Sequence, residues 1–422
     1  MKKIVALLVV LVMTVGILAA CGGSNGGDTP APAGDVQTDA ANQGGSAANT
    51  LKVGMVCIGD EQAAYDRNFY MAADAAKEIL AKEEINVEWM YTYNHPEGDD
   101  VATDCIELAE AGCQVVFLNS YGQEPAMLTV AADYPGTVFA ALTNEASQRD
   151  ELANTVNAFP SIFEGRYLAG VAAGCKLNQL IEEGTITADQ AVMGYVGAYT
   201  FAEVISGYTS FFLGAKSVCP SVTMKVEFIG SWGDPALEAQ AAQDLIDKGA
   251  VLISQHSDST TPATVANENG KFHVGYNISM IDVAPEASII SSRIDWTNYF
   301  VYMIECVAKG EPVPEDYFGQ GLASGDVVLT ELNEAVAAPG TMDKINEVKD
   351  QIINEDIHVF DTTTFTVGGA EAKEGFVDMD GDFVGEPDVN AIYSGYYHES
   401  FFKSAPNFDL RIDGIELINE AY

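Results

Sequence analysis

Apolar strand-like segments alternate with helical segments from Leu51 onward, and few chain folds accommodate that alternation. Strands that alternate with helices form a parallel sheet covered by helices on both faces. The pattern predicts strands at 51–58, 85–93, 114–118, 137–142 and 154–158, with helices at about 63–82 and 99–111 and another before residue 137. This first series predicts one doubly wound α/β unit.

The pattern starts a second time after a helical segment at 163–177, in which glycines and alanines gather on one side. Predicted strands follow at 192–196, 224–229, 251–254 and 273–276, with helices at 202–217, 235–248 and 262–269. Beyond this second series, a further strand is predicted at 288–292 and a helix at 298–309. Two successive doubly wound halves of similar size predict an α/β protein of two lobes. Each lobe is then a parallel sheet with helices on both faces, and a cleft separates the two.

The expected domain boundaries follow this repetition. Residues 51–158 with about 278–325 form the first lobe, and residues 159–277 with part of the C-terminal segment form the second. The periodicity weakens beyond about residue 310, so 326–422 is expected to be an extension that wraps the hinge region.

The first 50 residues have the pattern of an export signal followed by a tether. Lys2 and Lys3 precede an apolar run at 4–18 and the sequence Leu18-Ala19-Ala20-Cys21, which resembles a bacterial lipobox. The apolar run is shorter than the roughly 20 residues that a membrane span needs. We therefore expect residues 1–21 to be a signal peptide ending at a lipidated Cys21. Residues 22–50 are rich in Gly, Ser, Ala and Asn, a composition that predicts a disordered tether. The protein is then extracytoplasmic, anchored to the cell membrane by lipid.

The charge balance excludes nucleic acid as a partner. The formal net charge is −42, from 20 Lys and Arg against 62 Asp and Glu, and such a surface repels phosphate backbones and anionic lipid headgroups. The lipid on Cys21, and not a protein surface, must therefore make the membrane contact. Of the seven cysteines, the six beyond Cys21 form no C-x-x-C pair, and their apolar surroundings favour buried thiols, with disulfides left open.

No catalytic, cofactor or metal motif is recognisable. The sequence lacks G-x-S-x-G, Walker A, G-x-G-x-x-G and H-E-x-x-H patterns, and its five histidines are scattered. The aspartates at 378–382 resemble a calcium loop, but the glycine is misplaced and Val389 stands where the loop's final Glu belongs, which favours a turn. We predict a protein that is not an enzyme and holds no cofactor or metal.

Polar and aromatic residues instead follow the predicted strands, at the sheet edge where small molecules bind in open α/β folds. In the second half, Trp232 and Asp234 follow one strand, and His256, Ser257 and Asp258 follow the next. In the first half, Tyr65 and Asp66 stand where the first strand meets its helix. Helix capping or a surface position is the alternative for each polar residue. Tyr65 and Trp232 at matching edges of the two lobes favour a planar ligand held between two rings, with Asp66, Glu203 and Asp258 accepting from its donors.

Several segments together resemble the basic membrane protein family, also called the purine nucleoside receptor family, of ABC-transporter substrate-binding lipoproteins. They are Val53-Gly54-Met55-Val56, the Gly165–Gly174 run, Ser231-Trp232-Gly233-Asp234-Pro235 and Gln255-His256-Ser257-Asp258-Ser259. The resemblance covers about residues 51–310. It implies a type I periplasmic-binding-protein fold, an ABC permease as partner, and a purine base or nucleoside stacked between aromatic side chains.

The resemblance also implies individual site residues. The family's stacking pair at the first helix falls on Tyr65 and Asp66, its second stacking aromatic on Trp232, and its Ser-aromatic pair on Ser120 and Tyr121. Two ribose-binding positions are changed, since the family's Asp falls on Asn277 and its Lys falls near Asp295, beside Trp296. These changes favour a purine base or a differently decorated nucleoside.

Two alternatives remain at this stage. One is a receptor of the same fold for a sugar or another aromatic solute. The other is an exported hydrolase of nucleosides or glycosides acting through Asp66 and Asp258.

Overall fold

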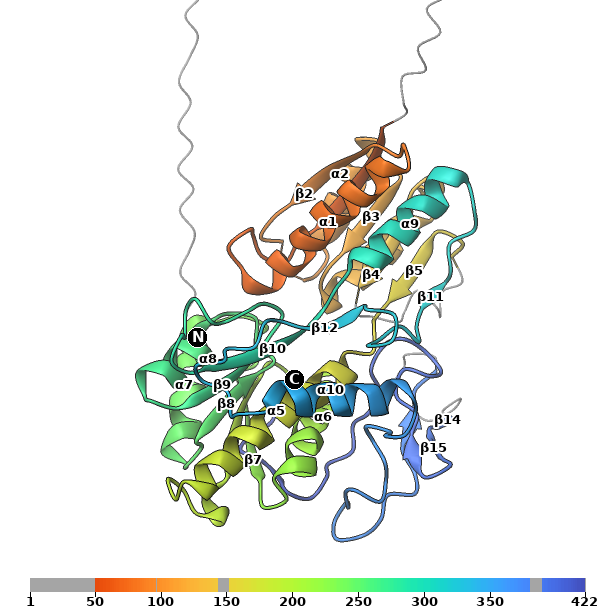
Figure 1. Cartoon of the computed structure of the whole chain (residues 1–422). Coiled ribbons are helices and arrows are strands. Elements are labelled where there is room, and N and C mark those ends of the chain that lie inside the picture. Colours follow the sequence, from red (N-terminus) through yellow and green to blue (C-terminus); the bar gives the residue numbers. More distant parts are fainter. Residues whose placement is uncertain (1–49, 96, 143–151, 380–388, 422) are drawn as a thin grey trace, which may run out of the picture. The chain divides into compact units, whose positions relative to one another are not determined.

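The computed structural model describes residues 50–95, 97–142, 152–379 and 389–421, which belong to one unit, Ala47–Tyr422 (Figure 1). The predicted signal peptide, Cys21 and the tether up to residue 49 lie outside the described residues, as does most of the aspartate loop at 378–382. Among the described helices, none combines the length and apolarity that crossing a membrane requires.

The described elements, in chain order, are β1 (Leu51–Val56), α1 (Ala64–Lys82), β2 (Val87–Thr92), α2 (Val101–Glu110), β3 (Val115–Leu118), η1 (Tyr121–Gln123), α3 (Glu124–Ala131), β4 (Val138–Leu142), β5 (Thr155–Ala158), α5 (Ile162–Glu182), η2 (Ala188–Gln190), β6 (Val192–Gly197), α6 (Ala202–Val218), β7 (Thr223–Phe228), α7 (Pro235–Asp247), β8 (Leu252–Gln255), α8 (Thr261–Glu268), β9 (Phe272–Tyr276), β10 (Ser288–Ile294), α9 (Thr297–Lys309), β11 (Asp316–Tyr317), β12 (Val327–Leu329), α10 (Thr341–Ile353), β13 (Phe376–Val377), β14 (Val389–Asn390), β15 (Ile392–Tyr393), β16 (Tyr396–Tyr397) and β17 (Ile415–Leu417).

Two large sheets form the framework of the described chain. The first has the strand order β11-β5-β4-β3-β1-β2, and the second has the order β12-β10-β9-β8-β6-β7-β17. All neighbours in both sheets are parallel except β12, which runs antiparallel to β10. In each sheet the order reverses direction beside an early strand, which is the doubly wound topology. The predicted α/β architecture of two parallel sheets is confirmed.

Alternating side chains explain why both faces of the first sheet are covered. Val116 and Leu118 of β3 pack with apolar residues of α2 and α3, whereas Val115 and Phe117 of the same strand join the cluster that contains α1 and α9. Because successive residues of a strand point to opposite faces, a continuous apolar strand is buried on both sides. In Figure 1, α1 and α9 accordingly lie along the sheet.

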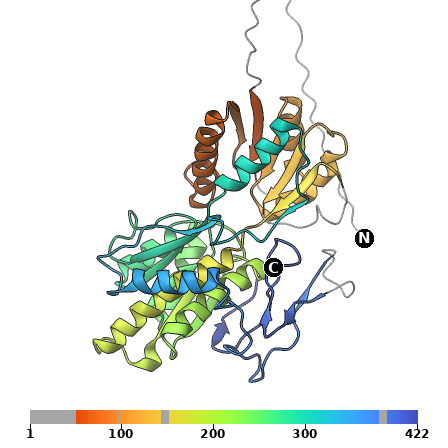
Figure 2. The same ribbon diagram turned by 45° about the vertical axis from the view of Figure 1, so that its right-hand side comes forward.

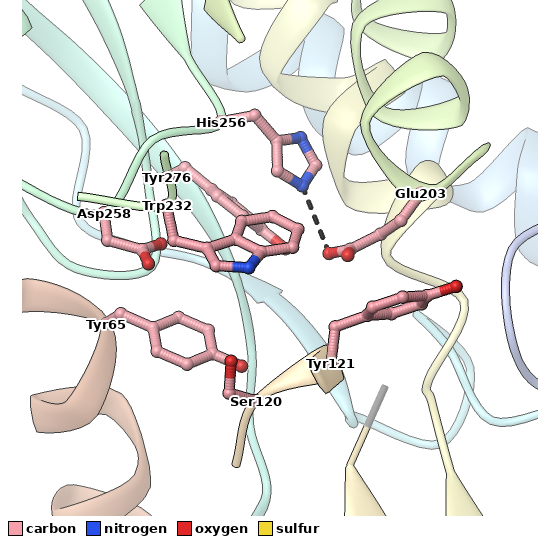
Figure 3. A pocket seen from close by; sticks show the side chains of 8 residues that line it. All are labelled: Tyr65, Ser120, Tyr121, Glu203, Trp232, His256, Asp258 and Tyr276. Carbon is pink, nitrogen blue, oxygen red and sulfur yellow. Dashed lines mark hydrogen bonds and ion pairs between the residues drawn. The ribbon is translucent and has the colours of Figure 1, made fainter. Parts of the chain in front are cut away.

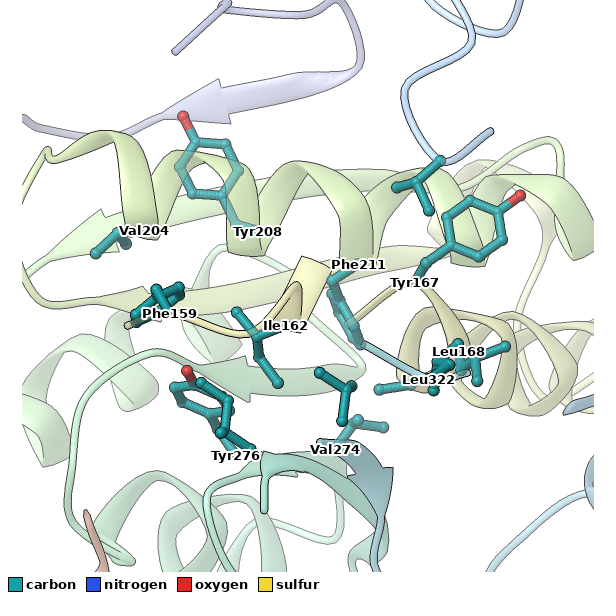
Figure 4. Close-up of a cluster of buried hydrophobic side chains, with 14 of the residues drawn as sticks. Phe159, Ile162, Tyr167, Leu168, Val204, Tyr208, Phe211, Val274, Tyr276 and Leu322 are labelled. Atoms are coloured by element: carbon teal, nitrogen blue, oxygen red, sulfur yellow. The ribbon is translucent and has the colours of Figure 1, made fainter. Parts of the chain in front are cut away.

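The second sheet is covered by α7 and α8 on one face and by α5 and α6 on the other. Helices α5 and α6 approach unusually closely, because glycines stand at the contact. A Cβ atom built on Gly170 would lie 2.0 Å from the Phe211 carbonyl oxygen, and one built on Gly214 would lie 2.0 Å from the Tyr167 carbonyl oxygen. Phe211 and Tyr167 both belong to the apolar cluster that contains these helices (Figure 4).

The chain passes three times between the two sheets. It leaves β5 for α5, returns from β10 to α9, and crosses again between β11 and β12. The expected boundary at about residue 278 is therefore too early, because β10 pairs with β9 in the second sheet and the chain returns to the first lobe only with α9. The pattern of a strand followed by a helix cannot reveal which of two sheets the strand joins.

The segment beyond residue 326 contributes to the second sheet through β12 and β17, and α10 packs against α5 (Figures 1 and 2). Other parts of it contact the segments that cross between the sheets. The Ser404 hydroxyl accepts from Asn157 Nδ2 at 2.8 Å, and the Ser404 N–H donates to the Asp316 carboxylate at 2.7 Å. These contacts support the proposal that part of the extension lies against the hinge.

The six cysteines of the described chain are free thiols, and all but Cys175 are buried. Burial raises the pKa of Cys57 and of Cys105 to about 12. Thiols of this kind are poor nucleophiles and act as small apolar side chains.

Candidate ligand-binding site

A cavity lies where the carboxyl ends of strands from both sheets meet (Figure 3). The cavity's own volume is about 20 Å³, and the space around it opens to solvent. The residues lining it come from α1, from the segment after β3, from the start of α6 and from the ends of β7, β8 and β9: Tyr65, Ser120, Tyr121, Glu203, Trp232, His256, Asp258 and Tyr276. A more open cavity adjoins it and shares Trp232 and Asp258. This is the edge that the sequence predicted for a ligand.

Stacked rings form one wall of the cavity. Trp232 contacts Tyr199 edge to face, with ring centroids 5.3 Å apart, and Tyr199 stacks on Phe201 at 5.1 Å. Tyr121 of the first lobe stacks on Phe201 of the second at 5.2 Å and an interplanar angle of 23°. This contact joins the two lobes at the cavity and fixes the position of the wall.

Tyr65 is held in place on the first-lobe side. Its hydroxyl donates to the Asn119 carbonyl oxygen at 2.5 Å, and its ring packs edge to face on Phe69 at 5.0 Å. Burial, together with nearby Asp258, raises the pKa of Tyr65 well above its usual value, so the hydroxyl stays protonated and remains a donor. Tyr65 and Trp232 line one cavity from different lobes, as the sequence predicted.

A chain of buried hydrogen bonds positions Glu203. Arg166 Nη2 donates to the Tyr195 hydroxyl at 3.1 Å, and that hydroxyl is 3.1 Å from His256 Nδ1. His256 Nε2 is 3.2 Å from Glu203 Oε1. The bonds are all satisfied when Tyr195 donates to Nδ1 and the His256 proton sits on Nε2, facing the carboxylate. The Arg166 guanidinium is also bonded to Gly275 O, Ser292 Oγ and Ser254 Oγ, so it is fixed behind the site.

Two aspartates face the cavities without a matching cation. Burial raises the pKa of Asp258 well above its usual range, and the charges of Asp66 and other acidic neighbours raise it further. Burial also raises the pKa of Asp66 to about 6, against hydrogen bonds from Asn119 and Gly59 that lower it. Asp66 Oδ1 accepts from Asn119 Nδ2 at 2.9 Å and from the Gly59 N–H at 3.3 Å, whereas its buried Oδ2 has no hydrogen-bond partner.

Replacing Asp66 with asparagine is expected to stabilise the ligand-free protein at neutral pH more than at acid pH. A carboxyl whose pKa is about 6 when folded and near 3.8 when unfolded binds more protons in the folded state, so its contribution to stability falls as pH rises from about 4 to above 6. That fall amounts to about 3 kcal/mol. Asparagine keeps the acceptor Oδ1 and does not titrate. The variant should therefore gain about 2.4 kcal/mol over the wild type between pH 4 and pH 7.5, most of the full change.

Urea unfolding of both proteins at the two pH values measures this gain. Asp133→Asn at an exposed turn is the matched control. Two results would contradict the assignment of this effect to a desolvated carboxyl. One is an equal gain in the Asp133→Asn control. The other is an unfolding free energy that changes with pH by the same amount in Asp66→Asn and in the wild type.

The structure brings seven of the predicted site residues into the first cavity: Tyr65, Ser120, Tyr121, Glu203, Trp232, His256 and Asp258. Asp66 lines the adjoining cavity. Five others line neither of these two cavities: Asp234, Ser257, Asn277, Asp295 and Trp296.

Local hydrogen bonds account for two of these five. Asp234 caps α7, and its Oδ1 accepts from the N–H groups of Ala236 and Leu237 at 2.9 and 3.1 Å. Asp295 Oδ1 accepts from the Thr297 N–H, and its Oδ2 pairs with Arg293 at 2.9 Å. Helix capping, the alternative considered for polar residues at strand ends, describes Asp234, whereas Asp295 lies before the N-cap residue Trp296 and is held by Thr297 and Arg293.

The other three are buried. Trp296 is 1% exposed and stacks on Phe69 at 5.3 Å in the core beneath α1 and α9. Asn277 has a positive φ of 69°, and its N–H donates to Ser292 O. Ser257 is buried, and its Oγ has no hydrogen-bond partner. Ligand contact by these five residues stays a prediction.

Sequence reasoning missed Tyr276, which lines the first cavity, and Glu97 and Tyr199, which line the second. Each stands at or just after the carboxyl end of a strand, a position that could have indicated them. Glu97 also accepts from the Ser120 hydroxyl at 2.6 Å. Within the described ranges, no group of three or more His, Cys, Asp or Glu residues could hold a metal ion.

Solved structures share this fold. The chain is similar to an ABC-transporter solute-binding protein from Aeropyrum pernix, with a TM-score of 0.58 and 16% identity over 74% of this chain and 93% of that one. It is also similar to one from Conexibacter woesei, with a TM-score of 0.55 and 18% identity over 73% and 98% of the two chains. This likeness shows the fold: the type I periplasmic-binding-protein fold.

The family follows from the sequence itself. The profile of the Bmp family, described as ABC transporter substrate-binding protein PnrA-like, matches residues 52–363, so the chain belongs to this family. The predicted family is confirmed. Its members are solute-binding proteins rather than enzymes, and they work outside the cytoplasm with a permease.

Two of the curated relatives are named for different ligands. An ABC transporter glucose-binding protein, TsgA13 of Haloferax volcanii, is 29% identical over 81% of this chain and 82% of its own length. A purine-binding protein of Brucella abortus is 32% identical over 62% of this chain and 69% of its own length.

Proposed function

We propose that this substrate-binding protein captures a purine base or nucleoside between its lobes and delivers it to an ABC permease. A flat heterocycle offers two faces to the rings of Tyr65 and Trp232 and an edge of donors and acceptors to the polar groups. The predicted lipid on Cys21 and the tether that follows would keep the protein near the permease.

The proposal rests on one observation: the aromatic side chains that line the cavities lie beside a buried hydrogen-bond donor and a buried acceptor that have no partner within the protein. Trp232 Nε1 is a buried donor without an acceptor, and Asp66 Oδ2 is a buried acceptor without a donor. A buried group left unpaired costs about 1–3 kcal/mol, so a ligand that pairs both is selected over one that pairs neither. Purines carry ring nitrogens that accept and N–H groups that donate.

The base, rather than the ribose, is the part for which contacts are available. By the resemblance, the family's ribose-binding positions fall on Asn277 and near Asp295; neither residue lines either cavity, and Asp295 is bonded to Arg293 and Thr297. The name of the Brucella relative also favours a purine.

A sugar is the second candidate, because tryptophan faces and carboxylate acceptors also suit a pyranose ring. The name of the Haloferax relative favours this reading. A sugar offers no aromatic face to stack between two rings, which is why we rank it second.

Titration calorimetry on the full-length mature protein decides between the two. Adenine, guanine, hypoxanthine, their nucleosides and glucose are titrated separately, and the ligand is recovered afterwards. We expect saturable binding of a purine with one site per chain and recovery of the unchanged compound. If no purine binds, the purine proposal is overturned. If glucose alone binds, the ligand is a sugar. If a nucleoside is recovered in hydrolysed form, the protein is a hydrolase.

A further inference from the structure

The excess of carboxylates around the cavity supports a narrower statement about the ligand, which rests on the proposed function. We propose that the preferred ligand is a positively charged flat heterocycle, such as an N-alkylated purine, whose charge lies beside Glu203 and Asp258 and against the surrounding rings (Figure 3).

The charges of the site are of one sign. Glu203 and Asp258 line the first cavity, and Asp66 and Glu97 line the adjoining one. Neither cavity has a lysine or arginine among its lining residues in the part of the chain that the structure describes. Arg166 is fully buried behind the site: its hydrogen bonds go to Tyr195, Ser254, Ser292 and Gly275, and its guanidinium lies 5.3 Å from the ring centroid of Tyr276, so it does not line the cavity itself. The ligand is left to supply the counter-charge.

Removing carboxylates from water without a counter-ion is unfavourable, and closing the lobes around a neutral ligand would increase that penalty. The direction of the Asp258 pKa, raised by burial and by acidic neighbours, fits a site that lacks positive charge. A cation beside Asp258 would favour the ionised form of that carboxyl. The attraction strengthens as solvent is excluded.

The rings point to the same ligand by a separate argument. Trp232, Tyr65, Tyr121 and Tyr276 all line the cavity, and Tyr199 lines the adjoining one. A cation over the face of Trp or Tyr is stabilised by about 0.5–1 kcal/mol in exposed sites and by about 2 kcal/mol once desolvated. A neutral heterocycle gains the stacking but not this attraction.

A buried, unpaired carboxylate oxygen is the third observation. Asp66 is 1% exposed, and its Oδ2 has no hydrogen-bond partner. It lines the cavity that is continuous with the first through Trp232 and Asp258. A ligand carrying N–H groups at its charged ring would satisfy this atom as well.

A pair of isomers separates charge from size. At pH 7, 1-methyladenosine is protonated and carries a positive charge, whereas N6-methyladenosine has the same non-hydrogen atoms and is neutral. Both are titrated into the full-length mature protein by calorimetry, with unmodified adenosine as reference. We expect 1-methyladenosine to bind about tenfold or more tightly than its neutral isomer. The preference should shrink as salt is raised, because ions screen charge attraction.

Variants locate the origin of the preference. Glu203→Gln and Asp258→Asn, each checked for folding by circular dichroism, are expected to reduce the ratio between the two isomers to about threefold or less, since each removes one charge but keeps the side-chain shape. Glu305→Gln is the matched control, because Glu305 pairs with Lys309 on the surface of α9 and should leave the ratio unchanged.

The outcomes distinguish the two proposals. If neutral purines bind as tightly as the cationic isomer or more tightly, the proposed function stands and the charge inference is overturned. If no purine of either kind binds, both are overturned. A ratio that persists in both carboxylate variants would also contradict the inference.

Discussion

Replacing Trp232 with alanine is expected to weaken purine binding by about 100-fold. The indole provides a ring wall of the cavity and also a buried N–H that has no acceptor within the protein. Losing a stacking partner costs about 0.5–1.5 kcal/mol beyond the buried area, and losing a hydrogen bond to the ligand adds about 1 kcal/mol. With the buried area included, about 3 kcal/mol is removed, which corresponds to the stated factor.

Calorimetry on three variants tests this expectation. Trp232→Phe keeps a ring but has no N–H, so it should lie between the wild type and the alanine variant. Tyr302→Ala removes an exposed ring on α9 and serves as the control that should not change affinity. An alanine variant with wild-type affinity would remove Trp232 from the binding site and leave the stacking proposal without support.

Replacing Gly214 with alanine is expected to destabilise the protein by about 2 kcal/mol or more. The new methyl group would begin 2.0 Å from the Tyr167 carbonyl oxygen, a backbone atom of α5 that cannot move aside as a flexible side chain can. Overpacking of this kind costs about 1–3 kcal/mol, occasionally more, and it outweighs the gain of up to about 1 kcal/mol that alanine brings to a helix. Helices α5 and α6 must separate, which disturbs the whole layer behind the second sheet.

Urea unfolding measures the effect, and Gly136 provides the matched control. A Cβ atom on Gly136 would meet nothing within 4 Å, so Gly136→Ala should change the unfolding free energy by about 0.5 kcal/mol or less. If Gly214→Ala is as stable as Gly136→Ala, the close approach of the two helices is not required by the fold.

The periodicity of apolar residues predicts the order of strands and helices, but it does not predict which of the two sheets each strand joins. The alternation of strands and helices from Leu51 to Lys309 matches the structure element by element. The strand at Ser288–Ile294 was assigned to the wrong sheet, because an apolar strand is equally suited to either. Short strands such as β11 and β17 have too few residues for any periodicity to register.

The site could be predicted in part, because the carboxyl ends of parallel strands converge. Tyr65, Trp232 and Asp258 were found in this way. Trp296 was not distinguishable from a site residue, since a large ring near a strand end packs equally well into a core. Asp234 has an acidic side chain at the right edge, but its oxygen is used by the helix that it begins. Such distinctions depend on three-dimensional neighbours that the sequence does not list.

The strand β17 has a consequence for shortened versions of this protein. It pairs with β7 along Ile415–Leu417, and these residues lie beyond position 363, where the match to the family ends. A chain trimmed to the family boundary would leave the backbone of Met224, Lys225 and Val226 without hydrogen-bond partners on that side. An open strand of this kind readily recruits strands from other molecules. Trimmed material should therefore self-associate and precipitate at concentrations where the full-length chain remains monodisperse.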